Sequence, residues 1–274
     1  MSVLAFHAAR KVSVVALHCS GASGRAWDRL RQTLGDGFNV VTPDLIGCGS
    51  TPHWMRPEAF RLTHEAAAAV AAIDACEGPV HLVGHSYGGG VALRVALERP
   101  RRIASLSLYE PTLFAVLAMM GDEGRVARAE IAAVAADVTR HVGAGVPANA
   151  ARRFVDYWNH PGAFETLKPE AQADIVRYVP KASLDFAALF GERVSLEAYR
   201  GLRIPLLMLR GEHAPQPAAL IAQKLAAVMR AKAFVTVQGA GHMGPFSHAE
   251  TVNRAIAQHI GVEDFHQVPE SAAA

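Results

Sequence analysis

The chain is poor in charged residues and in cysteine. Aspartate, glutamate, lysine and arginine make up 19% of its 274 residues, and the formal net charge is only +2. Because no run of lysine or arginine forms a basic stripe, we expect no nucleic-acid partner. The three cysteines, Cys19, Cys48 and Cys76, are odd in number and include no C-x-x-C pair. This pattern argues against a disulfide framework and favours a reducing compartment.

Long apolar runs are also missing. No stretch of the sequence reaches the length of a membrane span. A basic pair at 10–11 precedes the apolar segment 12–17, but that segment is too short for the hydrophobic region of a signal peptide. His18 precedes Cys19, where a lipoprotein cleavage site would carry a small residue. We therefore expect a cytoplasmic protein with no membrane partner.

Strand and helix patterns alternate at both ends of the chain. The hydrophobic content of 51% is enough to bury a large core. Short apolar runs predict strands at 11–18, 38–42, 80–83, 103–108, 205–209 and 233–237. Helical patterns follow at 25–34, 62–77, 86–97, 217–229 and 249–260. This alternation predicts an α/β fold, with a mostly parallel, doubly wound sheet that is covered by helices on both faces.

The middle of the chain has a different pattern. Between residues 111 and 200 no segment has a convincing strand pattern, and the helix-length stretches lie at 124–141, 147–158 and 169–178. The simplest organisation is a core interrupted by a helical insertion. Its parts are 1–110 (first part of the core), 111–200 (insertion), 201–260 (second part of the core) and 261–274 (a frayed tail without periodicity).

The clearest chemical signal follows the expected strand 80–83. Residues 84–88 read G-H-S-Y-G, which matches the G-x-S-x-G pattern. A sharp strand-to-helix turn lifts the hydroxyl of Ser86 clear of the sheet, and glycines are needed where that turn crowds the backbone. The alternative is a glycine-rich turn with a helix-capping serine. Phosphate-binding loops are not indicated, because neither G-x-x-x-x-G-K-[ST] nor G-x-G-x-x-G occurs here.

A nucleophilic serine needs a base, and His242 is the strongest candidate among 13 histidines. It lies in the glycine-containing segment 238–243, directly after the expected last strand. In a fold with this serine turn, the base lies on the loop after the last strand, from which its imidazole can reach Ser86. The alternative is an ordinary solvated loop histidine.

Four segments together resemble the α/β-hydrolase superfamily, and within it the capped, esterase-like serine hydrolases. They are residues 17–20 (L-H-C-S, with Trp27 behind them), 43–49 (P-D-L-I-G-C-G), 84–88 (G-H-S-Y-G) and 239–242 (G-A-G-H). They occur in the family's order, and the resemblance extends from about residue 11 to residue 260.

The resemblance implies an oxyanion hole formed by the backbone N–H groups of Tyr87 and Ser20. Such donors stabilise a tetrahedral intermediate by about 3 kcal/mol each. Asp44 and Gly47 are structural in this interpretation. Cys19 stands where the family usually has glycine, and we expect its thiol to be buried and poorly activated.

The acid of the triad is not in the family's usual place. That place is three residues beyond a glycine after the strand 205–209, and here Gly211 is followed at that distance by Ala214. The superfamily has a second site, at the end of the preceding core strand, where this chain carries Glu110. We therefore predict Glu110 as the acid, with Glu212 as the second choice. The alternative is that Glu110 only caps the entry to the insertion.

The resemblance further implies that segment 111–200 is a cap over the active site. Its aromatic residues could line an acyl pocket or pack in a core, and we select Trp158 as a substrate-binding residue. The predicted activity is hydrolysis of a small to medium, largely apolar ester through an acyl-enzyme, with a small-molecule substrate and no cofactor or metal. The alternatives are a C–C bond hydrolase, a perhydrolase or an acyltransferase with the same triad, or a ligand-binding receptor on this fold.

Overall fold

The centre of the molecule is a six-stranded parallel sheet. The computed structural model describes residues 11–56, 59–193 and 195–261. The strand order is β2-β1-β3-β4-β5-β6, and every neighbouring pair is parallel. The strands are β1 (Val12–Leu17), β2 (Phe38–Val41), β3 (Val80–His85), β4 (Ile103–Tyr109), β5 (Leu206–Gly211) and β6 (Ala233–Val237). The predicted α/β fold with a parallel sheet is confirmed.

The central strands are apolar because helices cover both faces of the sheet. In β1, every residue after Val12 is buried, and all of β3 except His81 is buried. Parallel strands that are enclosed in this way appear in a sequence as continuous apolar runs rather than as alternating ones. The edge strand β2 is only partly buried.

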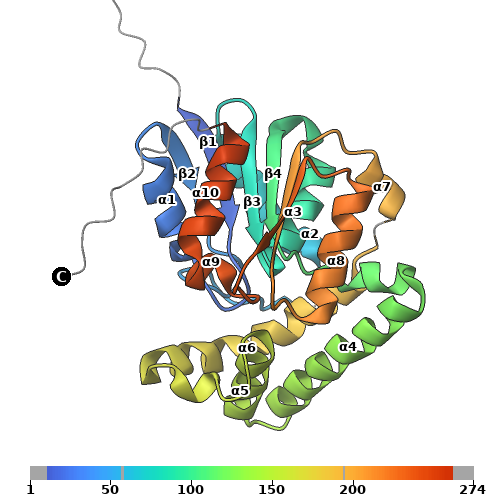
Figure 1. Ribbon diagram of the computed structural model, residues 1–274. Helices are drawn as coiled ribbons and strands as arrows, with labels where there is room; N and C mark the ends of the chain where they lie inside the picture. The colour runs from blue at the N-terminus through green and yellow to red at the C-terminus, as the bar shows by residue number, and fades with distance from the viewer. Residues whose placement is uncertain (1–10, 57–58, 194, 262–274) are drawn as a thin grey trace, which may run out of the picture.

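Two groups of helices cover the sheet (Figure 1). The helices α1 (Asp28–Leu34) and α10 (Ala249–Ile260) share one buried cluster with the strands, which includes Trp27, Leu30 and Ile256. The other face is covered by α2 (Leu62–Ala75), α3 (Tyr87–Glu98) and α8 (Gln216–Val228). The sheet is therefore doubly wound, and the carboxyl ends of all its strands meet at one edge.

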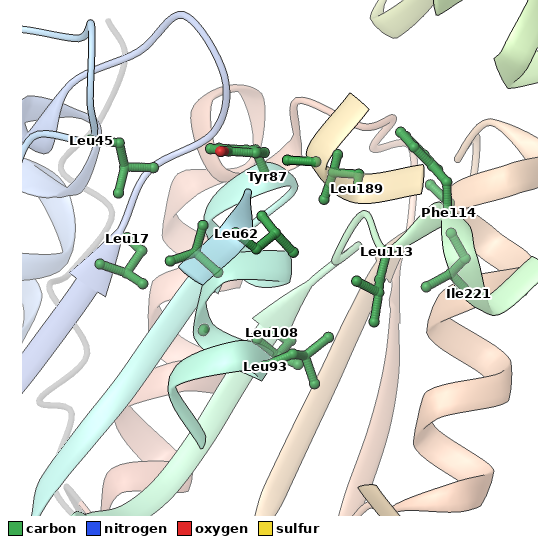
Figure 2. Close-up of a cluster of buried hydrophobic side chains, with 14 of the residues drawn as sticks. Leu17, Leu45, Leu62, Tyr87, Leu93, Leu108, Leu113, Phe114, Leu189 and Ile221 are labelled. Carbon is green, nitrogen blue, oxygen red and sulfur yellow. The ribbon is translucent and has the colours of Figure 1, made fainter. Parts of the chain in front are cut away.

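The described residues between β4 and β5 form helices joined by short loops, with no strand among them. It contains η3 (Phe114–Met119), α4 (Gly121–Gly143), α5 (Pro147–Trp158), η4 (Phe164–Thr166), α6 (Pro169–Gly191) and α7 (Leu196–Arg200). In Figure 1, α4, α5 and α6 lie beyond the carboxyl ends of the strands. Figure 2 shows Leu189 of α6 near Phe114 in a buried cluster that also contains Leu108 of the sheet. Since these helices share a core with the sheet, they are held firmly over its carboxyl edge.

Helix α6 is longer than the sequence predicts. The sequence pattern predicts a helix over residues 169–178, and a proline inside a longer helix removes a backbone donor and crowds the preceding turn. Helix α6 instead continues through Pro180 to Gly191. Its second half contributes Phe186 and Leu189 to the buried cluster, and this burial offsets the lost hydrogen bond. The prediction was wrong here because tertiary packing outweighs the local signal.

Residues 262–274 of the predicted tail lie outside the described residues. Within the described part of the chain, no helix is both long enough and apolar enough to cross a membrane.

Candidate active site

Ser86 occupies the sharp turn between β3 and α3. Its backbone has φ 53° and ψ −118°, a conformation that residues with a Cβ adopt rarely. The glycines that flank it are required by close approach: a Cβ on Gly88 would lie 2.4 Å from the carbonyl oxygens of Leu17 and His18. The strained turn places the Ser86 hydroxyl at the carboxyl edge of the sheet, at the wall of a cavity.

His242 lies within hydrogen-bond distance of this serine. Its Nε2 is 2.8 Å from Ser86 Oγ, and its side chain is buried. Two side chains fix the loop that carries it. The hydroxyl of Tyr109 donates to the carbonyl oxygen of Gly241 at 2.7 Å, and Nε2 of His85 donates to the carbonyl oxygen of His242 at 2.8 Å. Burial lowers the pKa of His85 well below its usual value, so this imidazole is a neutral donor.

Glu110 lies on the other side of the His242 ring. Its Oε2 is 2.6 Å from Nδ1 of His242, and its Oε1 accepts a hydrogen bond from Gly211 N at 2.6 Å. The Glu110 side chain is fully buried, and its backbone also has a positive φ, of 41°. Because the carboxylate accepts from Nδ1–H, Nε2 of His242 is left unprotonated and can accept the Ser86 proton.

Glu212 has a different partner. Its Oε2 accepts a hydrogen bond from Gly239 N at 2.8 Å, and the side chain is exposed. Glu212 therefore anchors the loop that leads to His242, whereas the carboxylate within reach of the imidazole belongs to Glu110.

A mainly apolar cavity of about 340 Å³ opens beside Ser86 and His242. Its aromatic and aliphatic walls come from η3, α5 and α6 and include Phe114, Phe154, Trp158, Ile175, Phe186 and Leu189. The charged residues among the described lining are two carboxylates, Asp174 and Asp185, and none of these lining residues is a lysine or an arginine. The site thus favours an uncharged, apolar ligand group.

The structure places the remaining predicted residues as follows. Ser20 lines the cavity. Tyr87 is the first residue of α3, and its backbone N–H is among those without an acceptor inside the helix. Trp158 lines the cavity and stacks on His242, with ring centroids 4.2 Å apart and an angle of 28° between the planes. The thiol of Cys19 is buried, and this burial raises its pKa to about 12.

Sequence reasoning missed a group of buried charged residues next to the cavity. Asp185 lines the cavity, and Lys181 and Glu65 lie behind it with less than 3% of each side chain exposed. The available signal was the spacing of Lys181 and Asp185, which places them on one face of a helix that is otherwise apolar there. In the described part of the chain, no group of three or more histidine, cysteine, aspartate or glutamate side chains could hold a metal ion.

The comparisons with known proteins agree with this fold. The family model described as "Alpha/beta hydrolase family" matches residues 14–255. The chain is similar to Lipase LipV of Mycobacterium tuberculosis, with 37% identity over 101 residues, which are 36% of this chain and 37% of the lipase. It is also similar to 2-hydroxy-6-oxo-2,4-heptadienoate hydrolase of Pseudomonas putida, with 35% identity over 101 residues, which are 35% of this chain and 36% of that protein. Each alignment therefore spans little more than a third of the curated relative.

A solved structure described as a hydrolase from Pseudomonas aeruginosa PA01 has a similar fold. The TM-score is 0.68 at 22% sequence identity, and the alignment covers 93% of this chain and 91% of that one. This likeness shows the fold, and the family match extends over most of the chain. The protein therefore belongs to the α/β-hydrolase family.

Proposed function

We propose that the protein is a serine esterase that cleaves a small to medium, largely apolar ester through an acyl-enzyme. Ser86 is the nucleophile, His242 the general base and Glu110 the acid that orients it. The observation that carries this proposal is the unbroken series of hydrogen bonds from Ser86 Oγ through the His242 imidazole to the Glu110 carboxylate, next to an apolar cavity.

The first half of the reaction forms the acyl-enzyme. His242 removes the proton from Ser86 Oγ as this oxygen attacks the ester carbonyl, and a tetrahedral oxyanion results. The backbone N–H groups of Tyr87 and Ser20 bind the oxyanion and contribute about 3 kcal/mol each. The positive end of the α3 dipole at Tyr87 adds to this stabilisation. His242 then gives the proton to the leaving alkoxide, which departs as an alcohol.

The second half repeats this chemistry with water. His242 removes a proton from a water molecule, the resulting hydroxide attacks the acyl carbonyl, and the Ser86 oxygen leaves and recovers its proton from His242. Glu110 stays ionised throughout and stabilises the imidazolium that forms in each half. Trp158 lies against one face of the same ring, where a cation–π interaction favours the imidazolium further.

The charges around the cavity support a neutral substrate. A substrate carboxylate would leave water for an apolar space whose described lining includes no lysine or arginine, and the nearby cations Arg177 and Lys181 are already paired with Asp174 and Asp185. The relative from Pseudomonas putida is named for a dienoate, which carries a carboxylate. The cavity therefore favours a neutral ester over C–C bond hydrolysis of a dienoate.

The test is hydrolysis of a series of p-nitrophenyl esters, from acetyl to dodecanoyl, by the wild type and by Ser86→Ala. We expect the wild type to hydrolyse the series with a preference for one chain length, and Ser86→Ala to lose at least 10³-fold in kcat/KM, as expected on removal of a triad member. A heptadienoate substrate run in parallel should be turned over poorly. The reverse preference would favour a C–C bond hydrolase, and a wild type inactive on every ester would contradict the proposal.

A further inference from the structure

A buried polar network lies behind the active site and is not part of the triad. At its centre is Lys181 of α6, whose Nζ lies 3.0 Å from Glu65 Oε2 and also donates to Asp185 Oδ1. All three side chains are almost completely buried. Glu65 comes from α2 and Asp185 from α6, so the network joins a helix over the carboxyl edge of the sheet to a helix on its face.

Each carboxylate of this network also binds one residue of the proposed oxyanion hole. Ser20 Oγ donates to Asp185 Oδ2 at 2.9 Å, and the Tyr87 hydroxyl donates to Glu65 Oε2 at 2.9 Å. The ammonium group of Lys181 lies 4.9 Å from the centroid of the Tyr87 ring, within the range of a cation–π interaction. Lys181 is therefore connected to both Ser20 and Tyr87, through the carboxylates and through the ring.

The charge balance of this network makes it a poor source of folding stability. Two carboxylates share one ammonium group, so the buried cluster carries a formal net charge of −1. Burial raises the pKa of Glu65, whereas the pKa of Lys181, which burial alone would lower, is raised by Asp185 and Glu65. Replacing a buried ion pair by well-packed apolar residues is often neutral or stabilising. Stability alone therefore gives little reason for such a network at this place.

We propose that Lys181 is a positioning residue, which holds the backbone N–H groups of Ser20 and Tyr87 at the oxyanion through Asp185 and Glu65. This inference rests on the proposed esterase function. Oxyanion donors act only at about 2.7–3.1 Å from the developing charge, and a misplacement of about 1 Å can cost roughly 10²-fold in rate. The side-chain hydroxyls of Ser20 and Tyr87 donate to Asp185 and Glu65, so removing either hydroxyl loosens the backbone that carries an oxyanion donor.

The test uses changes that remove a single polar group. Ser20→Ala and Tyr87→Phe each delete one hydroxyl, and Lys181→Met deletes the ammonium group. We expect each to lower kcat by about 10- to 100-fold, with KM within about twofold of the wild type. The inhibition constant of an alkyl trifluoromethyl ketone, whose adduct with Ser86 carries an oxyanion, should rise by the same factor as kcat falls. A residue that is only structural would lower the melting temperature without this parallel loss.

The matched control is Tyr199→Phe, because the buried Tyr199 hydroxyl has no hydrogen-bond partner among the described residues. It should leave kcat, KM and inhibitor binding unchanged. Adding Tyr87→Phe to Lys181→Met should cost less than the product of the two separate losses, since both changes act through the same contacts.

The possible outcomes separate the two proposals. If Lys181→Met does not fold, Ser20→Ala and Tyr87→Phe decide the question. Unchanged kcat and inhibitor binding in both, beside an active wild type, would overturn the positioning role. A wild type without esterase activity would instead overturn the proposed function.

Discussion

Replacing Glu110 by glutamine changes one carboxylate oxygen to an amide nitrogen and leaves the shape of the side chain almost unaltered. In the structure both oxygens accept hydrogen bonds, one from Gly211 N and the other from Nδ1–H of His242, each at 2.6 Å. A glutamine amide has only one oxygen, so it can satisfy only one of these donors. If its NH₂ group faces His242, Nδ1 must become the acceptor and the ring proton moves to Nε2. In that tautomer His242 cannot accept the Ser86 proton.

The size of the expected loss of kcat in Glu110→Gln follows from the wrong tautomer of His242 and from the lost negative charge. An acid-to-amide change that keeps the geometry of such a triad lowers kcat by about 10⁴-fold, or roughly 5 kcal/mol of transition-state stabilisation. If the amide turns its NH₂ group toward Gly211 N instead, a buried donor is left without an acceptor, at a cost of about 1–3 kcal/mol of stability. The assay is kcat and KM on the best p-nitrophenyl ester, with circular dichroism and thermal unfolding to establish that Glu110→Gln is folded.

Glu212→Gln is the matched control. Its carboxylate is exposed and accepts one hydrogen bond, from Gly239 N, which the glutamine oxygen can still accept. We expect it to lose less than about tenfold in kcat, or roughly 1.4 kcal/mol. If Glu212→Gln loses several orders of magnitude and Glu110→Gln does not, the acid lies after β5 and the reasoning is refuted.

Two further predictions concern the cavity wall and the buried histidines. Trp158→Ala should enlarge the cavity and move the preference to longer acyl chains, with a several-fold loss of kcat from the missing cation–π contact of about 1 kcal/mol. Trp158→Phe should retain most of kcat. A uniform loss of activity across the ester series, with no change of chain-length preference, would contradict a role of Trp158 in binding. Burial lowers the pKa of His18 and His85, so below about pH 6.5 the unfolded chain binds more protons than the folded one. The free energy of unfolding should then fall with decreasing pH, by up to roughly 1.4 kcal/mol per pH unit for each histidine. The free energy of unfolding is measured by urea titration at a series of pH values. For His85→Gln it should depend less steeply on pH than for the wild type, and an identical pH dependence would rule out His85 as a contributor.

Features that depend on short sequence patterns could be predicted well. Strand β6 (Ala233–Val237) and helices α5 (Pro147–Trp158) and α10 (Ala249–Ile260) have the bounds that their apolar patterns indicate. Ser86, Glu110 and His242 each follow a strand, and parallel strands end at one edge of the sheet. This topology explains why the three side chains come close together, but Glu212 also follows a strand at that edge, so the choice of Glu110 rested on the resemblance to the superfamily.

Features that depend on how helices pack over the sheet could not be predicted. The stacking of Trp158 on His242 requires α5 to lie across the carboxyl edge, and no periodicity within α5 specifies that placement. The buried pair of Lys181 and Glu65 joins residues 116 positions apart, and a single charged residue in a sequence does not reveal its distant partner.

Covalent labelling of Ser86 tests the central claim most directly. A fluorophosphonate reacts with a serine only when that serine is activated as a nucleophile, and peptide mass spectrometry then locates the phosphonyl group. We predict one adduct in the wild type, on the peptide that contains Ser86, and none at that peptide in folded Ser86→Ala or His242→Ala. Labelling of Ser86→Ala to the same extent as the wild type would contradict the account.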